Sequence, residues 1–225
     1  MSKTISKIQC FEGCHMRYKL SYIDNLEQES SSIFEKGKTL HYILEKFNYF
    51  EIIKGFIDSD VGTKFYPIIK DSEKEKRIGL KIQNNNLITC SFNDCGCIIR
   101  GVIDAIYKNN IIDYKSGKYV THSNQNWLQL EFYALWLFLN SNYDEIKVSY
   151  LYIEHNKENT RIIKRSECKD IIKNIFTRIN DIIKYEQSPD DSHNVSALCD
   201  YCTVRHHCPH YKDDTVLLNK VDIQI

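Results

Sequence analysis

The sequence has few of the residues that link or separate domains, and it has no long apolar run. Only three prolines and eight glycines occur among 225 residues, which leaves little of the chain for flexible linkers. No apolar run reaches the roughly eighteen residues of a membrane span, and Met1–Lys7 lacks the apolar core of a secretory signal. We therefore expect a cytoplasmic protein without a membrane partner.

The chain also lacks an excess of either charge. Its 30 basic and 30 acidic residues give a formal net charge of zero, so global charge does not indicate whether nucleic acid is a partner. Local charge is more informative, because residues 161–185 are predominantly basic and include the pattern of a long helix. Such a helix can hold phosphates, although a basic face that is simply solvated is an equally good interpretation.

Apolar residues make up 42% of the chain, enough to bury the core of one compact domain. The patterns indicate an α/β fold with a central mixed sheet flanked by helices. We expect a single domain over residues 1–211, which includes a C-terminal cysteine module, and a tail over 212–225. The predicted elements are helices up to about residue 69, a strand meander over about 78–115, a helix over 126–139, strands near 148–153 and 161–163, and a long helix near 167–185.

Two aspartates on neighbouring predicted strands indicate a cation site. Asp104 lies in an apolar strand, and Asp113 lies in the next strand, after a turn at 108–110. Strand pairing brings the two carboxylates together, where they repel each other unless a cation lies between them. Oxygen ligands of this kind suit Mg²⁺ or Mn²⁺. Lys115 points to the same face as Asp113 because strand side chains alternate with a period of two.

Simpler interpretations are open for these residues and for three others. An Asp and a Lys two residues apart on a strand usually form a weak ion pair on a solvated face. Gln129 and Tyr133 lie one turn apart in a buried helix, where they either contact a DNA strand or satisfy each other inside the core. His41, in an earlier predicted helix, is either a third metal ligand or an exposed side chain.

The order of these residues resembles the RecB-type branch of the PD-(D/E)XK nucleases. The shared pattern is Gly37-x-x-x-His41, Gly101-x-x-Asp104, Asp113-Tyr114-Lys115-Ser116-Gly117 and Gln129-x-x-x-Tyr133. The resemblance implies a restriction-endonuclease-like core that hydrolyses DNA phosphodiester bonds. It further implies His41, Asp104 and Asp113 as ligands of Mg²⁺ or Mn²⁺, Lys115 as the catalytic lysine beside Asp104 and Asp113, and Gln129 and Tyr133 as DNA-positioning residues.

Nine cysteines are present, and in a reducing compartment clustered cysteines indicate metal binding rather than disulfides. Cys199, Cys202 and Cys208 have the spacing C-x₂-C-x₅-C, which leaves a four-ligand site one ligand short. Cys14 can supply the fourth ligand from far upstream, and Cys10 is the competing candidate. Spacing alone permits either a [4Fe–4S] cluster or Zn²⁺, which also accepts Cys₄ or Cys₃His.

Cys14, followed by Arg17-Tyr18, and the C-terminal cysteines together resemble the iron–sulfur site of the CRISPR-associated Cas-four exonucleases and of the AddB nuclease domain. The resemblance covers about residues 6–211. It implies a structural [4Fe–4S] cluster with Cys14 as the fourth ligand, and an exonuclease acting on DNA ends or single strands. The expected context is either CRISPR spacer acquisition in antiviral defence, beside an integrase, or phage or bacterial recombination and repair, beside a helicase.

Two other hypotheses stay open. A zinc- or cluster-stabilised DNA-binding module with little or no nuclease activity would use the same cysteines, although the intact Asp104, Asp113 and Lys115 argue against it. A second metal site at Cys90, Cys95 and Cys97 is disfavoured because these residues form no C-x₂-C pair and have no evident fourth ligand. We expect them to flank a hairpin turn at 92–96, between strands over 86–90 and 98–100.

Overall fold

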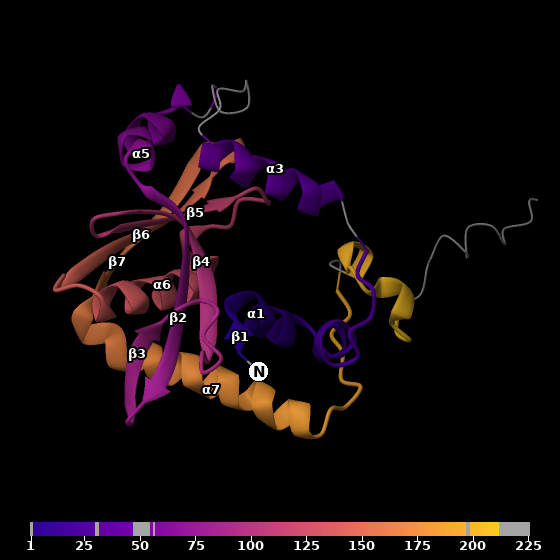
Figure 1. The fold of residues 1–225 in the computed structure, drawn as a ribbon. Coiled ribbons are helices and arrows are strands. Elements are labelled where there is room, and N and C mark those ends of the chain that lie inside the picture. The colour runs from indigo at the N-terminus through magenta and orange to yellow at the C-terminus, as the bar shows by residue number, and fades with distance from the viewer. Residues whose placement is uncertain (1, 30–31, 47–54, 56, 197–198, 212–225) are drawn as a thin grey trace, which may run out of the picture. The chain divides into compact units, whose positions relative to one another are not determined.

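The structure of the protein is a computed structural model that describes residues 2–29, 32–46, 55, 57–196 and 199–211. The chain forms two compact units, a division finer than the single domain expected from the sequence (Figure 1). Unit 1 comprises Met1–Ile8 and Ser32–Asp181, and unit 2 comprises Gln9–Ser31 and Ile182–Ile225. The tail expected over 212–225 lies outside the described residues.

Unit 1 is built on a mixed seven-stranded sheet, which confirms the predicted α/β architecture. The strand order is β3-β2-β4-β5-β6-β7, and β1 pairs in parallel with β4. The strands β5 and β6 are parallel, and the other neighbours are antiparallel. The strands are β1 (Lys3–Thr4), β2 (Glu73–Gln83), β3 (Asn86–Cys90), β4 (Ile99–Tyr107), β5 (Asn110–Lys115), β6 (Glu145–Tyr152) and β7 (Lys157–Lys164).

The helices of unit 1 cover both faces of this sheet. Tyr114 of β5 packs in a buried cluster with Leu40 of α3 (Ser32–Lys46) and Phe65 of α5 (Asp60–Lys70). The next residue, Lys115, hydrogen-bonds to Gln129 of α6 (Leu128–Leu139). Because neighbouring strand residues point to opposite faces, α3 and α5 lie on one face and α6 lies on the other.

Helix α6 lies in the interior of unit 1. It has no Gly or Pro and is apolar at most positions, so it is buried along most of its length. It approaches β4 closely at Gly101, where an added Cβ would lie 2.9 Å from a ring carbon of Phe132 and 3.0 Å from one of Tyr133. Neither α6 nor another helix within the described residues is both long and apolar enough to cross a membrane.

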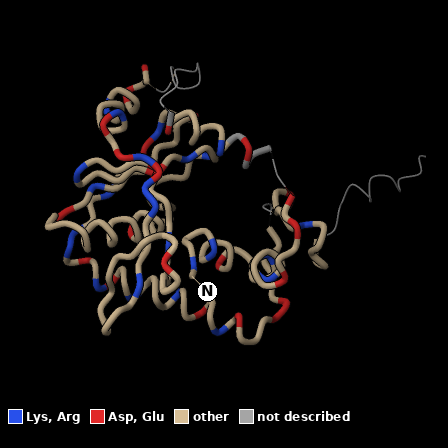
Figure 2. Tube along the Cα trace, in the orientation of Figure 1, with Lys and Arg blue, Asp and Glu red and all other residues tan. Residues whose placement is uncertain are grey.

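Two local predictions were wrong. The expected hairpin between 86–90 and 98–100 does not form, because β3 and β4 both pair with β2 and lie on either side of it. The tight hairpin joins β2 to β3 at Asn84 and Asn85, whose φ angles of 50° and 61° suit a two-residue turn. Strand β2 also begins earlier than expected. The pattern did not predict its first residues, because Glu73–Arg77 alternate in charge rather than in hydrophobicity (Figure 2).

Unit 2 is formed by two separate parts of the chain. The first follows the start of α1 (Ile5–Gly13), and the second comprises the end of α7 (Cys168–Gln187) and the segment beyond it. Met16, Leu20 and Val204 form its small buried core. The Tyr18 hydroxyl donates to a Glu186 carboxylate oxygen at 2.6 Å, which ties the two segments together. Its short elements are α2 (His15–Tyr18), a π-helical turn (Lys19–Ile23) and two 3₁₀ turns (Cys199–Tyr201 and Arg205–His207).

We expect Gly101→Ala to destabilise the protein by about 1–3 kcal/mol, because the new methyl group must displace the Phe132 and Tyr133 rings. Each kcal/mol should lower the melting temperature by about 2–4 °C in a chain of this size, measured by scanning calorimetry. Gly117→Ala is the matched control, since nothing lies within 4 Å of its added Cβ. Equal melting temperatures for the two variants would contradict the close packing of α6 on β4.

Candidate metal centres

Asp104 lies between two other carboxylates on the sheet. Its side chain is buried. The register of β4 with β5, continued by one residue, places Asp113 opposite Asp104. On the other side of β4, strand β2 pairs Lys74 with Ala105 and Lys76 with Ile103, so Glu75 of β2 lies opposite Asp104. Like charges directly across a strand pair repel each other, and this arrangement therefore favours a bound cation.

The backbone departs from regular strand geometry on both sides of Asp104. Its Oδ2 accepts a hydrogen bond from the backbone N–H of Tyr114 at 2.6 Å, next to the last regular β4–β5 pair. Glu75 has a φ of 51°, a left-handed conformation that is strained for a residue with a side chain. Strain of this kind persists where the surrounding structure enforces it, and it often marks functional sites.

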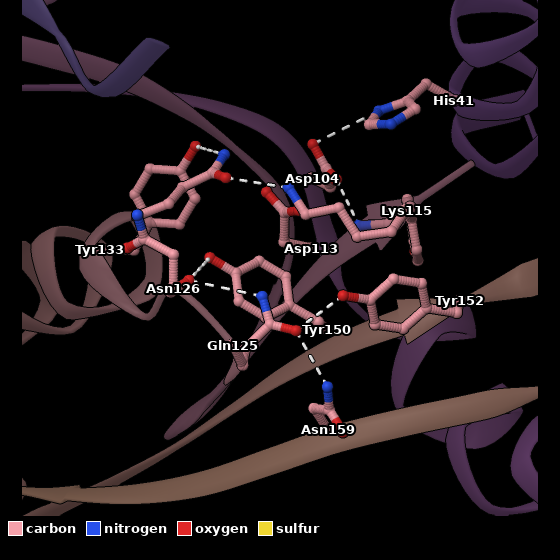
Figure 3. A network of polar contacts seen from close by, with 12 residues as sticks. His41, Asp104, Asp113, Lys115, Gln125, Asn126, Tyr133, Tyr150, Tyr152 and Asn159 are labelled. Atoms are coloured by element: carbon pink, nitrogen blue, oxygen red, sulfur yellow. Dashed lines mark hydrogen bonds and ion pairs between the residues drawn. The ribbon is translucent and has the colours of Figure 1, made fainter. Parts of the chain in front are cut away.

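Helix α3 adds His41 to this group. Its Nδ1 lies 3.5 Å from Oδ1 of Asp104 (Figure 3). Ligand atoms of His41, Glu75 and Asp104 lie within 4.8 Å of one another. Gly37, one turn earlier, allows α3 to approach the end of β5, because an added Cβ would lie 3.0 Å from Oγ of Ser116. A cavity of about 520 Å³, lined by α3, Glu75 and Ser116, opens over the group.

The surroundings shift the pKa values of all three groups. Burial, and then the Asp113 charge, raises the pKa of Asp104. Burial and the Asp104 charge raise the pKa of Glu75. The contact with Asp104 raises the pKa of His41 despite its burial. A divalent cation reverses these tendencies, because it stabilises ionised carboxylates and a neutral imidazole. The donor set therefore fits a divalent metal.

Lys115 places a positive charge beside the carboxylates. Its Nζ lies 2.7 Å from Oδ2 of Asp113 (Figure 3). Burial lowers the pKa of Lys115, but the charge of Asp113 and the contact with it outweigh this effect, so the net shift is upward. The side chain is therefore an ammonium ion. This form suits stabilisation of a negatively charged phosphate and does not suit a general base.

Gln129 and Tyr133 hold Lys115 in position. A lysine only donates hydrogen bonds, so the Gln129 carbonyl accepts from Nζ at 3.0 Å, and the Gln129 amide donates to the Tyr133 hydroxyl at 2.9 Å. The Tyr133 hydroxyl donates in turn to the Val102 backbone carbonyl. Tyr133 is only 3% exposed. Any contribution of Gln129 and Tyr133 to DNA positioning is therefore indirect, through the lysine that they hold.

Glu75 is the site residue that the sequence analysis missed. It lies in a run of charged residues that has the appearance of an exposed segment, and it is exposed in the structure. Only the pairing of β2 with β4 places it beside Asp104. The sole sequence signal is the position of this charged run directly before the apolar half of β2.

Part of the basic stretch over 161–185 is engaged within unit 1. Arg161 forms ion pairs with Glu131 and Glu167 at 2.7 and 2.5 Å. Arg165 donates to the backbone carbonyls of Phe138, Ser141 and Tyr143. Arg161 thus joins β7 to α6, and Arg165 joins the 3₁₀ turn after β7 to the end of α6 and the segment that follows it. The phosphate hypothesis then concerns the other basic residues of the stretch.

Unit 2 brings the predicted cysteine ligands around one cavity of about 400 Å³. Backbone N–H groups point at three of the sulfur atoms, from Arg17 to Cys14, from Ser196 to Cys199 and from Val204 to Cys202. Hydrogen bonds to sulfur are a usual feature of iron–sulfur sites. Burial, the largest effect, raises the pKa of the Cys202 thiol, and the Val204 N–H partly offsets it. The chemistry of the donors therefore fits a thiolate-bound metal group. The cysteines that line the cavity are Cys10, Cys14, Cys199, Cys202 and Cys208.

Cys10 and Cys14 lie one helical turn apart in different surroundings. Burial raises the pKa of Cys10 to about 11, which keeps it a neutral thiol. Cys14 is the N-cap residue of α2 and accepts from the Arg17 N–H at 3.5 Å. This contrast favours Cys14 over Cys10 as the fourth ligand.

Comparison with known proteins identifies the family. The model of the PD-(D/E)XK nuclease superfamily matches residues 2–209. The chain belongs to this superfamily. No curated protein matches the chain. Among solved structures, the chain is similar to a predicted exonuclease from Eubacterium rectale, with 14% identity, a TM-score of 0.55 and coverage of 99% of this chain and 94% of that chain. It is also similar to the crystal structure of SSO0001, with 14% identity, a TM-score of 0.46 and coverage of 94% and 87%.

Membership of the PD-(D/E)XK superfamily explains the charged group on the sheet. The superfamily implies hydrolysis of phosphodiester bonds in DNA, with divalent metals as cofactors. The site formed by His41, Glu75 and Asp104 supplies the nitrogen and oxygen ligands for such a metal. Asp113 and Lys115, which the sequence analysis predicted as the acidic and basic residues of the superfamily motif, lie beside this site.

We expect Asp104→Asn to raise the melting temperature of the metal-free protein. The folded-state pKa of Asp104 is raised, so stability falls as the pH rises from the unfolded-state pKa through the folded-state value. Asparagine removes this cost at neutral pH and keeps an acceptor for the Tyr114 N–H. Each kcal/mol regained should add about 2–4 °C, measured by calorimetry in EDTA at pH 8.

Added Mg²⁺ or Mn²⁺ should then stabilise the wild type more than Asp104→Asn, because a ligand that binds only the folded state stabilises that state. Glu73→Gln is the matched control, since Glu73 lies on β2 but pairs with Lys76 on the surface. A melting temperature of Asp104→Asn in EDTA at or below that of the wild type would contradict this electrostatic account.

Proposed function

We propose that this protein is a metal-dependent DNA exonuclease of the RecB and Cas-four type, which degrades DNA from ends or in single strands. The observation that carries the proposal is the convergence of Asp104, Asp113 and Lys115. Two carboxylates on paired strands lie beside an ammonium group, and α3 brings His41 to the same place. An enzyme with these groups has a metal-binding part and a phosphate-binding part side by side, since the Lys115 Nζ lies 2.7 Å from Asp113 Oδ2.

Each residue has a role in the proposed hydrolysis. His41, Glu75, Asp104 and Asp113 would hold Mg²⁺ or Mn²⁺, which binds the scissile phosphate and lowers the pKa of an attacking water. The Lys115 ammonium group stabilises the negative charge that develops on the phosphate. Gln129 and Tyr133 fix the lysine in the direction of that charge, so little reorganisation is needed during the reaction.

The preference for ends and single strands rests on the resemblance of the sequence motifs to those of exonucleases. The biological context follows the same resemblance. We propose that the enzyme acts in a reducing compartment, either beside an integrase in CRISPR spacer acquisition and antiviral defence or beside a helicase in phage or bacterial recombination and repair.

We further propose that unit 2 binds a [4Fe–4S] cluster through Cys14, Cys199, Cys202 and Cys208. A single zinc ion with Zn–S bonds of about 2.3 Å needs sulfur atoms about 3.8 Å apart. Among the described residues, no three cysteines place their sulfur atoms within 4.8 Å of one another. Cysteines spaced more widely around a cavity suit a cluster, in which each sulfur binds a different iron.

Lys115→Ala should reduce cleavage of a labelled single-stranded oligonucleotide by at least about 100-fold, because it removes a charge directed at the scissile phosphate. Asp113→Ala should abolish cleavage, as should a chelator. Lys108→Ala is the matched control, because Lys108 lies in the turn at the opposite end of β5. Metal-dependent cleavage by Asp113→Ala would refute the site, and rapid digestion of closed circular duplex would refute the exonuclease assignment.

Protein purified without oxygen should contain about four irons and four sulfides per chain, with visible absorption. Cys14→Ser should lose this absorption and become less stable, whereas Cys10→Ser should keep it. Metal analysis of the three proteins side by side provides the measurement. Zinc in place of iron would overturn the cluster, and loss of iron in Cys10→Ser alone would move the fourth ligand to Cys10.

A further inference from the structure

Residues 117–127 form a largely exposed segment that begins two residues after Lys115, yet buried groups of β6 and β7 hold it in place. Asn159 of β7 is 2% exposed, and its amide donates to the Val120 carbonyl at 2.7 Å and to the Gln125 side chain at 2.9 Å. The Tyr152 hydroxyl of β6 also donates to Gln125, at 2.6 Å (Figure 3). Buried polar groups need such partners, so displacing the segment would leave them unsatisfied.

Three rings lead from Lys115 to the surface of this segment. The Lys115 ammonium lies 4.7 Å from the centroid of the Tyr150 ring. The Tyr150 ring lies 5.7 Å from that of Trp127, at an angle of 33°. The Trp127 ring lies 5.1 Å from that of His122. Tyr150 is buried, Trp127 is half-buried and His122 is exposed, so the rings extend from the active site towards solvent.

Trp127 has no evident task in the local fold that requires an indole. Trp127 is the N-cap residue of α6, but its side chain makes no capping hydrogen bond, and the Leu128 N–H donates to Asn126 Oδ1 at 3.0 Å instead. The Tyr150 hydroxyl donates to the Asn126 carbonyl at 3.1 Å and fixes the backbone on the other side. Neighbouring residues therefore position Trp127 while its ring keeps an accessible part.

We propose that Trp127 is a stacking platform for a base of the substrate strand and that His122 flanks this platform. The proposal deepens the proposed function and rests on it. Proteins that bind single strands combine cationic groups for the phosphates with aromatic rings on which successive bases stack. Here the cation and the platform are separated by one buried ring, so a single strand can meet both.

This platform accounts for two properties of the proposed enzyme. Every base has a π face, so stacking on an indole tolerates any sequence, as degradation of a strand requires. A base inside a duplex is already stacked on its neighbours, whereas an unpaired base gains a partner. The platform therefore favours single strands and frayed ends over intact duplex.

Fluorescence provides a direct test, because Trp127 and Trp136 are the two tryptophans of the chain. Trp136→Phe leaves Trp127 as the single indole, and Asp113→Asn prevents cleavage. Adding a single-stranded oligonucleotide to this double variant should quench the Trp127 emission. In a series of oligonucleotides with one abasic site each, which lack one base but keep every phosphate, quenching should disappear at one position and persist at the others.

Binding measurements with Trp127→Ala complete the test. The variant, again with Asp113→Asn, should bind the intact oligonucleotide about 5- to 150-fold more weakly, since one base–aromatic stack contributes about 1–3 kcal/mol. Trp127→Phe should keep most of the affinity. An abasic site at the sensitive position should weaken binding to the protein with Trp127 but not to Trp127→Ala, a pattern that a general loss of structure does not produce.

The outcomes separate the platform from the proposed function. Unchanged Trp127 emission at saturating oligonucleotide, or the same abasic profile with and without Trp127, overturns the platform. Trp136→Phe alone, given Mn²⁺ and the same oligonucleotide, reports on nuclease activity independently. Cleavage with silent Trp127 emission overturns only the platform, whereas the absence of both binding and cleavage overturns the proposed function as well.

Discussion

Electrostatic repulsion around Asp104 is the constraint on which the site depends. Glu75, Asp104 and Asp113 lie on three adjacent strands, whose registers place the three residues opposite one another. The sheet tolerates them through a strained Glu75, a side-chain hydrogen bond to the backbone at Tyr114 and a lysine beside Asp113. The hydrogen bond and the lysine lower the cost of the negative charge, whereas the backbone strain at Glu75 adds a cost of its own. The folded state is thus locally less stable in return for holding the charged groups of the site together.

Helices on the two faces of the sheet contribute different residues around these carboxylates. Helix α3 brings His41 to the carboxylates from one face, and it can approach because Gly37 has no side chain. Helix α6 holds Lys115 from the other face through Gln129. The parallel neighbour β6 adds Tyr150 beneath the lysine. The candidate catalytic groups therefore depend on contacts with α3, α6 and β6 as well as on the short sequence motifs that contain them.

Sequence patterns predicted the elements that have a regular apolar pattern, and they failed where strand pairing depends on residues far apart in the sequence. The apolar strands around Asp104 and Asp113, the turn after Tyr107 and the helix with Gln129 and Tyr133 are evident from alternation and turn residues. Glu75 was missed because its strand is charged on both faces and forms only by pairing with β4. The hairpin at 92–96 was wrong because a turn signal does not tell which strand lies next to which. The cysteine spacing predicted a shared site, and unit 2 gathers these residues around one cavity.

The hydrogen-bonded chain from Lys115 to the Val102 carbonyl has a fixed direction. Its first member only donates and its last only accepts, so every group between them must accept on one side and donate on the other. A glutamate at position 129 would accept at both ends, and Tyr133 would then have to turn its proton away from the Val102 carbonyl. Glutamine is therefore not interchangeable with its near-isostere at this position. Because the Val102 carbonyl on β4 can only accept a hydrogen bond, it determines which side chain at position 129 can support the lysine on β5.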